Sequence, residues 1–148
     1  MAADGPMARA LELAEAAARH GEVPVGAVIV RNGEIIAEAM NAMRSLNDPT
    51  AHAEMRVIRE ALGILSAERL TDCDLYVTLE PCTMCAGAIA HARLRRLYYG
   101  APDPKGGAVD NGVRFFSAPT CHHRPEVIAG VSESAAAALL REFFSARR

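Results

Sequence analysis

The sequence lacks the features that mark several classes of protein. It has no run of roughly 18–20 apolar residues, so no segment is expected to span a membrane. Residues 1–22 carry charges throughout and lack the apolar centre of a secretory signal. The formal net charge is only -2, so any contact with nucleic acid must use local patches. These absences predict a cytoplasmic protein.

Cysteine is also scarce, with four residues and no disulfide-dense pattern. In a reducing compartment, spaced cysteines indicate metal binding or catalysis more than disulfides. The chain has 148 residues, 51% of them hydrophobic, which is enough to bury a substantial core. No repeat, linker or low-complexity tract divides it, so residues 1–148 are expected to form a single domain.

The first part of the chain predicts a helix and a β-hairpin. Apolar residues follow a helical spacing over Met7–His20, and Gly21 ends the pattern. Strands are expected at Val23–Val30 and Ile35–Ala39. The pair Asn32-Gly33 between them is typical of a tight hairpin turn.

The rest of the chain predicts alternating helices and strands. A helix is expected to start at Asp48-Pro49, with Asp48 as its N-cap, and to end at Gly63. The nearly all-apolar Asp74–Leu79 is typical of a strand covered on both faces, and Pro81 is expected to open the next helix. The remaining expected elements are strands at Leu94–Gly100 and Glu126–Gly130 and a final helix capped by Ser132 or Ser134. Together these elements predict an α/β fold, a three-layer α/β/α sandwich with a mixed sheet of about five strands.

Three residues have the chemistry and spacing of zinc ligands. Cys82 and Cys85 lie three positions apart at an expected helix start, where the helix dipole lowers thiol pKa values. His52 can supply a third ligand, which leaves the fourth position of the tetrahedron for water. Glu54 can serve the same site only if His52 lies at an irregular helix entry, because two helical positions differ by about 200°. The upstream Asp48-Pro49 makes such an entry reasonable.

Other uses of a Cys-x-x-Cys pair are a redox couple or half of a structural zinc site. A redox pair commonly follows the first strand, whereas this pair follows the third. A structural site needs a fourth protein ligand, for which Cys73 and Cys121–His123 are the nearby candidates. The combined pattern His-Ala-Glu followed by Pro-Cys-x-x-Cys is that of zinc deaminases, in which the glutamate is an acid and base and not a ligand. Catalytic zinc is therefore favoured.

The sequence resembles the bacterial tRNA-specific adenosine deaminases of the cytidine/deoxycytidylate deaminase superfamily. The resemblance rests on "NDPTAHAEM", "LYVTLEPCTMCAGAIAHARLRRLYYGAPDPKGGA" and "LLREFFSARR" and covers nearly the whole chain. It implies a cytidine-deaminase-like fold, one zinc ion per subunit and a homodimer. The implied reaction converts adenosine to inosine at the wobble position of tRNA, chiefly an arginine tRNA with an ACG anticodon, by attack of a zinc-activated water on C6 of the base.

The resemblance also implies roles for individual residues. His52, Cys82 and Cys85 match the zinc ligands, and Glu54 matches the residue that transfers protons. Asn41 matches an asparagine that binds the purine, and Asp103 an aspartate beside the substrate sugar. Without the resemblance, Asn41 reads as a turn residue and Asp103 as a solvated loop acid. The RNA footprint of Val109–His123 has no assignment, and Cys121, His122 and His123 are expected to pack or lie on the surface.

Two other functions compete with this one. A deaminase of a free base or nucleoside (guanine, cytosine or cytidine) would use the same metal centre, but it would not need phosphate contacts. The arginines expected around the site, Arg93, Arg95, Arg96 and Arg147-Arg148, argue for an RNA anticodon stem-loop. A non-catalytic zinc-stabilised binding module would have no use for Glu54.

Overall fold

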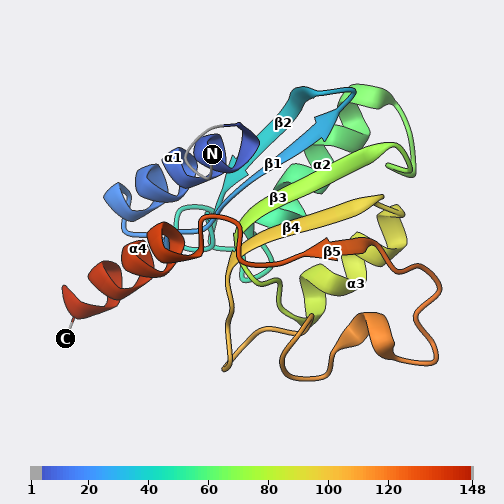
Figure 1. Ribbon diagram of the computed structural model, residues 1–148. Helices are drawn as coiled ribbons and strands as arrows, with labels where there is room; N and C mark the ends of the chain where they lie inside the picture. The colour runs from blue at the N-terminus through green and yellow to red at the C-terminus, as the bar shows by residue number, and fades with distance from the viewer. Residues whose placement is uncertain (1–4, 148) are drawn as a thin grey trace.

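The computed structural model describes residues 5–147, and a five-stranded sheet lies at its centre (Figure 1). The elements in chain order are α1 (Pro6–Arg19), β1 (Gly26–Arg31), β2 (Glu34–Met40), α2 (Ala53–Leu65), β3 (Cys73–Leu79), α3 (Thr83–Ala92), β4 (Arg96–Ala101), the 3-10 turn η1 (Phe115–Ser117), β5 (Glu126–Ile128) and α4 (Glu133–Ser145). Within the described residues, no helix has the length and apolar character needed to cross a membrane.

The sheet is mixed, with the spatial order β2-β1-β3-β4-β5. Strand β1 pairs antiparallel with β2 and with β3, whereas β3, β4 and β5 run parallel. Helices α2 and α3 cover one face, and α1 and α4 contact each other on the other face (Figure 1). The larger core lies between the sheet and α2 and α3, where Leu75, Val77 and Leu97 are buried. The predicted three-layer α/β/α sandwich is confirmed.

The hairpin also agrees with its prediction. Asn32 and Gly33 have φ angles of 52° and 78°, and a two-residue turn with positive φ at both positions matches the twist of the flanking strands. Strand β1 begins at Gly26 and not at Val23. The N–H of Val25 donates to the carbonyl of Val23 at 2.8 Å, so this short stretch turns locally before it joins the sheet.

Two helices begin later than expected. Asp48 does not cap α2, because its Oδ1 accepts hydrogen bonds from the backbone N–H and the hydroxyl of Thr50 at 2.8 and 2.7 Å. The N-cap of α2 is His52, and the N-cap of α3 is Cys82, which lies one residue after Pro81. Both delays place a candidate zinc ligand at a helix entry.

The strand register gathers the candidate residues at one edge of the sheet. Gly26 pairs with Met40, so the start of β1 lies beside the end of β2. Since β1 is antiparallel to β3, this start also lies beside the end of β3. Leu79 at the end of β3 pairs with Ala101 at the end of β4. The loops that follow β2, β3 and β4 therefore leave the sheet at the same edge.

The Val109–His123 segment closes the core beside α3. Its 3-10 turn contacts α3, and Phe116 and Cys121 are buried. The Cys121 thiol donates to the carbonyl of His123, and Nε2 of His123 lies 2.6 Å from the carbonyl of Leu94. The expected packing role of Cys121 and His123 agrees with these contacts.

Candidate metal centre

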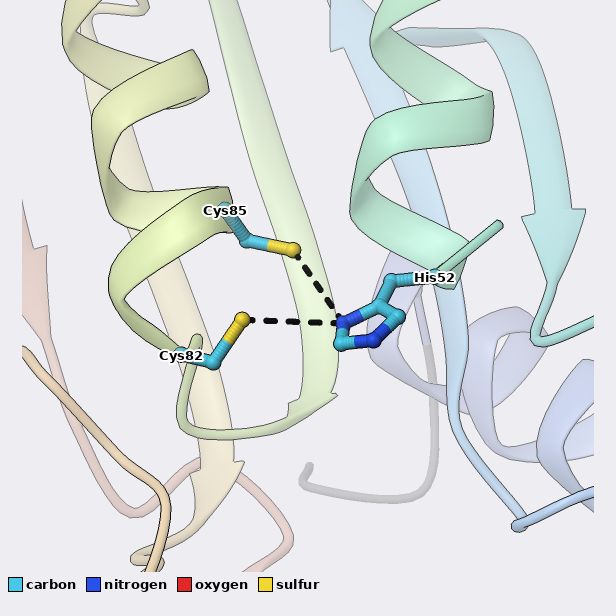
Figure 2. A group of neighbouring side chains, drawn as sticks. All are labelled: His52, Cys82 and Cys85. Carbon is cyan, nitrogen blue, oxygen red and sulfur yellow. Dashed lines mark hydrogen bonds between the residues drawn. The ribbon is translucent and has the colours of Figure 1, made fainter. Parts of the chain in front are cut away.

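His52, Cys82 and Cys85 come together between the first turns of α2 and α3 (Figure 2). Their ligand atoms lie within 4.8 Å of one another. The His52 Nδ1 is 3.6 Å from each of the two sulfurs. Zinc bond lengths in a tetrahedral site predict a nitrogen–sulfur separation of about 3.6 Å. The donor atoms and their spacing therefore fit a zinc ion.

Helix entries present these ligands to one another. His52 and Cys82 are N-caps with extended backbones, at φ -71° and ψ 151° and at φ -74° and ψ 177°. Cys85 is the third residue of α3 and is buried. The positive ends of two helix dipoles thus face the site, and they favour thiolates.

The two thiols differ in acidity. The hydrogen bond from Cys85, together with His52, lowers the pKa of the Cys82 thiol to about 4 despite its burial. The same hydrogen bond and burial raise the pKa of Cys85. The hydrogen bond with Cys82 raises the pKa of the His52 imidazole. The site therefore holds a thiolate at Cys82 at neutral pH, which suits a cation.

Glu54 is buried beside these ligands, with 4% of its surface exposed. Burial raises the pKa of its carboxyl to about 7, where a carboxyl group can both accept and donate protons. It lies on the same side as His52 because His52 has an extended backbone outside the helix. His52 therefore lies at a helix entry, as the sequence required if Glu54 is to serve the same site.

A cavity of about 250 Å³ opens in front of the metal centre. Asn41 and Asp103 lie on its wall together with His52, Glu54 and Cys82. The structure therefore brings the predicted site residues to one place, with Cys85 behind the wall. The full lining is Val23, Val25, Asn41, Met43, His52, Glu54, Leu79, Glu80, Cys82, Asp103 and Gly106.

Asn41 and Asp103 differ in how they are held. The backbone N–H of Asn41 donates to the carbonyl of Val25 at 3.0 Å, and its side chain is 5% exposed. Within residues 5–147, the Asn41 amide has no hydrogen-bond partner, so it is available to a ligand in the cavity. Oδ1 of Asp103 accepts from the N–H groups of Lys105 and Gly106 at 3.1 and 3.0 Å. Asp103 therefore shapes its own turn.

A second cavity, of about 790 Å³, shares Val23, Leu79, Asp103 and Gly106 with the first. The C-terminal helix forms its far wall with Leu140 and Phe144, and Arg147 lies just beyond the helix. Phe143 is buried whereas Phe144 is 48% exposed. The two cavities therefore share part of their walls, and the larger one extends to α4.

The expectation that Arg93, Arg95 and Arg96 surround the site is wrong. Arg95 forms a salt bridge with Asp74 at 2.8 Å, and Arg96 forms one with Glu126 at 2.8 Å. Asp74 is near the start of β3, about 17 Å along the strand from its end at Leu79, and Arg93 caps the distant C-terminal end of α3. Among the described lysine and arginine side chains, Lys105 and Arg147 line the larger cavity, and none lines the smaller one. Arg148 lies outside the described residues.

Sequence reasoning missed two buried carboxylates, Glu80 on the wall of the smaller cavity and Glu22 directly before Val23. Glu80 and Glu22 are each 2% exposed. The backbone N–H groups of Arg44 and Ser45 donate to Glu22 at 3.1 and 2.7 Å, and the loop after β4 donates to Glu80. The available signal for Glu80 was its position directly after a nearly all-apolar strand, because an acidic residue next to a buried strand needs hydrogen-bond donors if it is buried as well.

Comparisons with known proteins agree with this geometry. Residues 3–101 match the family model of the cytidine and deoxycytidylate deaminase zinc-binding region. A protein of Agrobacterium fabrum named tRNA-specific adenosine deaminase is 61% identical over 142 residues, which cover 96% of this chain and 93% of that protein.

Two solved structures extend the comparison. A structure from studies of A-to-I editing by tRNA:A34 deaminases at the wobble position has a TM-score of 0.90 at 61% identity, covering 91% of this chain and 98% of that one. A guanine deaminase from Nitrosomonas europaea has a TM-score of 0.78 at 25% identity, covering 95% and 83%. The matched zinc-binding region and the relatives named for tRNA show that the chain belongs to the cytidine and deoxycytidylate deaminase family, among the tRNA-specific adenosine deaminases.

Proposed function

We propose that this protein, acting as a single deaminase domain, hydrolyses adenosine to inosine and ammonia at the wobble position of tRNA. The observation that carries the proposal is the placement of a buried glutamate beside a His-Cys-Cys group at the end of an open cavity. The relatives at 61% identity are named for this substrate, whereas the guanine deaminase is 25% identical.

His52, Cys82 and Cys85 would hold the zinc ion, with Nδ1 and two sulfurs as donors. Zinc bound there supplies Lewis-acid activation of water, which makes a nucleophile available at neutral pH. Glu54 would take one proton from the attacking water and deliver it to the adenine ring nitrogen N1. It would then pass the second proton of that water, from the new hydroxyl on C6, to the amino group, which departs as ammonia. Its burial supports this role, because a carboxyl with a raised pKa can act as base and acid in turn.

Asn41 would bind the edge of the adenine, since its amide offers a donor and an acceptor and is free in the cavity. Val23, Val25 and Leu79 give the same cavity apolar walls that keep bulk water from the base. The larger cavity toward α4 would take the flanking nucleotides, with Lys105 and Arg147 near their phosphates. Asp103, which lines both cavities, would contact the sugar.

The test compares catalytic efficiency on an RNA stem-loop with an ACG anticodon against free adenosine, guanine and cytidine. We expect efficient A-to-I conversion of the stem-loop and very poor turnover of the free compounds. Asn41→Ala should weaken the reaction with RNA while zinc content stays unchanged. Better turnover of a free base or nucleoside than of the RNA would replace this proposal with the free-base alternative, and release of no ammonia from any substrate would leave a binding module.

We also propose that the protein is a homodimer in the cytoplasm, where its tRNA substrate is found. Helix α3, with the sequence TMCAGAIAHA, has no Asp, Glu, Lys or Arg. Met84, Gly87 and Ala88 on it are only partly buried. A largely apolar helix without charged residues is normally buried, and a second copy of the chain would cover this surface.

A further inference from the structure

The Glu80 carboxylate is enclosed by the loop of residues 102–111, here called the rim loop. Its Oε1 accepts from the N–H of Asp103 at 2.9 Å and from Nδ2 of Asn111 at 2.7 Å. Its Oε2 accepts from the N–H groups of Val109, Asp110 and Asn111 at 3.0, 2.9 and 3.0 Å. Both oxygens are thus fully engaged by a segment that is 23 or more positions away in sequence.

No ion pair to Glu80 is present within residues 5–147. Five N–H donors take the place of a cation, and a buried charge requires such compensation. Because four of the donors belong to the backbone, they are available only when the rim loop has this path. The carboxylate and the loop conformation therefore depend on each other.

Gly107 shows how closely the rim loop approaches Glu80. A Cβ atom at this position would lie 2.5 Å from Cδ of Glu80 and 2.6 Å from the carbonyl oxygen of Asp103. Any side chain there would push the loop away from the carboxylate. Asp103, which provides the first donor, and Gly106, which directly precedes Gly107, form part of the wall of both cavities.

We propose that Glu80 is a positioning residue that fixes the substrate-facing wall of the active site through the rim loop. It makes no bond to substrate in this role. It holds Asp103 and Gly106 at a set distance from the metal centre, since Glu80 is two residues from Cys82 on the same chain segment. This inference rests on the proposed function, because it assigns the rim loop to substrate binding.

The first test measures loop order without substrate. Glu80→Gln keeps the shape but turns an NH₂ group toward at least two donors, which leaves them unsatisfied. In zinc-loaded protein, amide hydrogen exchange at residues 103–111 should speed up by at least about tenfold, with the exchange of β3 and β4 unchanged. Unchanged exchange in the rim loop would overturn the proposal whatever the enzyme's substrate is.

The second test measures how the loop affects the reaction with the stem-loop. KM should rise by about tenfold in Glu80→Gln, with kcat changed less and zinc content unchanged. Asp74→Asn is the matched control, because Asp74 is a buried carboxylate at the opposite end of the same strand. It should lower the Tm without changing KM. Equal effects of the two variants on KM, or zinc loss in Glu80→Gln, would overturn the positioning role.

A swap of polarity provides a rescue. In Glu80→Gln/Asn111→Asp, the Gln amide can donate to the new carboxylate while its oxygen still faces three backbone N–H groups. We expect the KM of the double variant to be lower than the product of the two single-variant increases would give. Gly107→Ala should raise KM as Glu80→Gln does. Recovery of Tm alone would reduce Glu80 to a purely structural residue. Altered exchange in a protein inactive on RNA would refute the proposed function and leave the loop contact standing.

Discussion

The four side chains proposed for the metal centre have two proposed tasks, metal binding and proton transfer, and single substitutions separate the two. His52, Cys82 and Cys85 provide donor atoms at tetrahedral spacing, whereas Glu54 has no place in that set and is buried beside it. A ligand and a proton carrier give opposite results in a measurement of metal content.

Replacing Cys82 or Cys85 with Ala should remove zinc and activity together. Purified protein should carry about one zinc per chain, and each variant should fall to near zero with a lower Tm, because metal binding adds to folding free energy. Elemental analysis checks the result. Cys121→Ser is the control, since Cys121 is bonded to His123 beside α3. Full zinc in both Ala variants, or a halved count in the control, would contradict the ligand assignment.

Glu54→Gln should keep its zinc and lose turnover. The amide preserves the shape of the side chain but cannot exchange protons, so kcat should fall by at least about 10²-fold. Metal analysis and single-turnover kinetics on the stem-loop measure the two quantities separately. A variant that lost its metal would make Glu54 a ligand.

Glu22 should make stability depend on pH. Burial alone would raise the pKa of its carboxyl, but hydrogen bonds from the backbone N–H groups of Arg44 and Ser45 lower it below the ordinary 4.5. A lowered pKa in the folded state stabilises the protein above pH 4.5, and this contribution is lost as pH falls through the lowered value.

Glu22→Gln is therefore expected to cost about 1–3 kcal/mol of unfolding free energy near neutral pH, because it leaves a buried donor unsatisfied. Urea unfolding from about pH 6 to about pH 3 should show wild type approaching the variant. A gap that stayed constant over this range would show that the carboxylate charge contributes nothing.

At the scale of the elements, spacing and turn chemistry predicted more than capping did. Asn32-Gly33 fixed the hairpin because the turn needs positive φ at two positions. The predicted start of α2 was wrong because an aspartate before a proline can either cap a helix or accept hydrogen bonds from a turn residue such as Thr50. Tertiary context decides between these two roles. Helical geometry did predict the position of His52 correctly: for His52 and Glu54 to face one site, His52 had to lie at the entry of the helix and not inside it.

Helix α3 should form the contact between two copies of the chain. Gly87→Arg places a charge on the outer surface of α3, where an added Cβ meets no heavy atom within 4 Å, and should weaken dimerisation by at least about tenfold. Sedimentation velocity over a concentration series measures this effect. Ala135→Arg, on the exposed side of α4, is the control and should leave the dimer intact. A monomeric wild type would refute the dimer, and a dimer unchanged by Gly87→Arg would show that α3 does not form the contact.

At the scale of the whole molecule, closeness in sequence did not predict which arginines lie near the candidate metal centre. Arg95 and Arg96 are near the candidate metal ligands in the sequence, but the length of a strand separates these arginines from the ligands in space. The reason is that α3 runs back to the opposite edge of the sheet before β4 starts. Arg147 is remote in sequence and lies on the cavity wall. Only the register of the sheet distinguishes these cases, and a single sequence does not contain it.

RNA affinity should therefore depend on salt through few basic residues. Arg147→Ala should weaken stem-loop binding and reduce the slope of log K against log salt by about 1. Arg95→Ala should leave the slope unchanged, because this guanidinium is paired with Asp74 at the other edge. Fluorescence anisotropy across a salt series tests both. If only Arg95→Ala reduced the slope, the RNA would bind at the opposite edge of the sheet and the prediction would be wrong.

The C-terminal helix contributes to the entrance and provides no donor atom to the metal group. The residues proposed for the chemistry lie between Asn41 and Asn111, and the part of α4 that lines the larger cavity lies more than twenty residues later in the sequence. Selection can therefore alter what enters by changing the tail, while the reactive centre stays under separate constraint. Such modularity offers a route by which one scaffold serves both a tRNA-editing relative and a guanine deaminase.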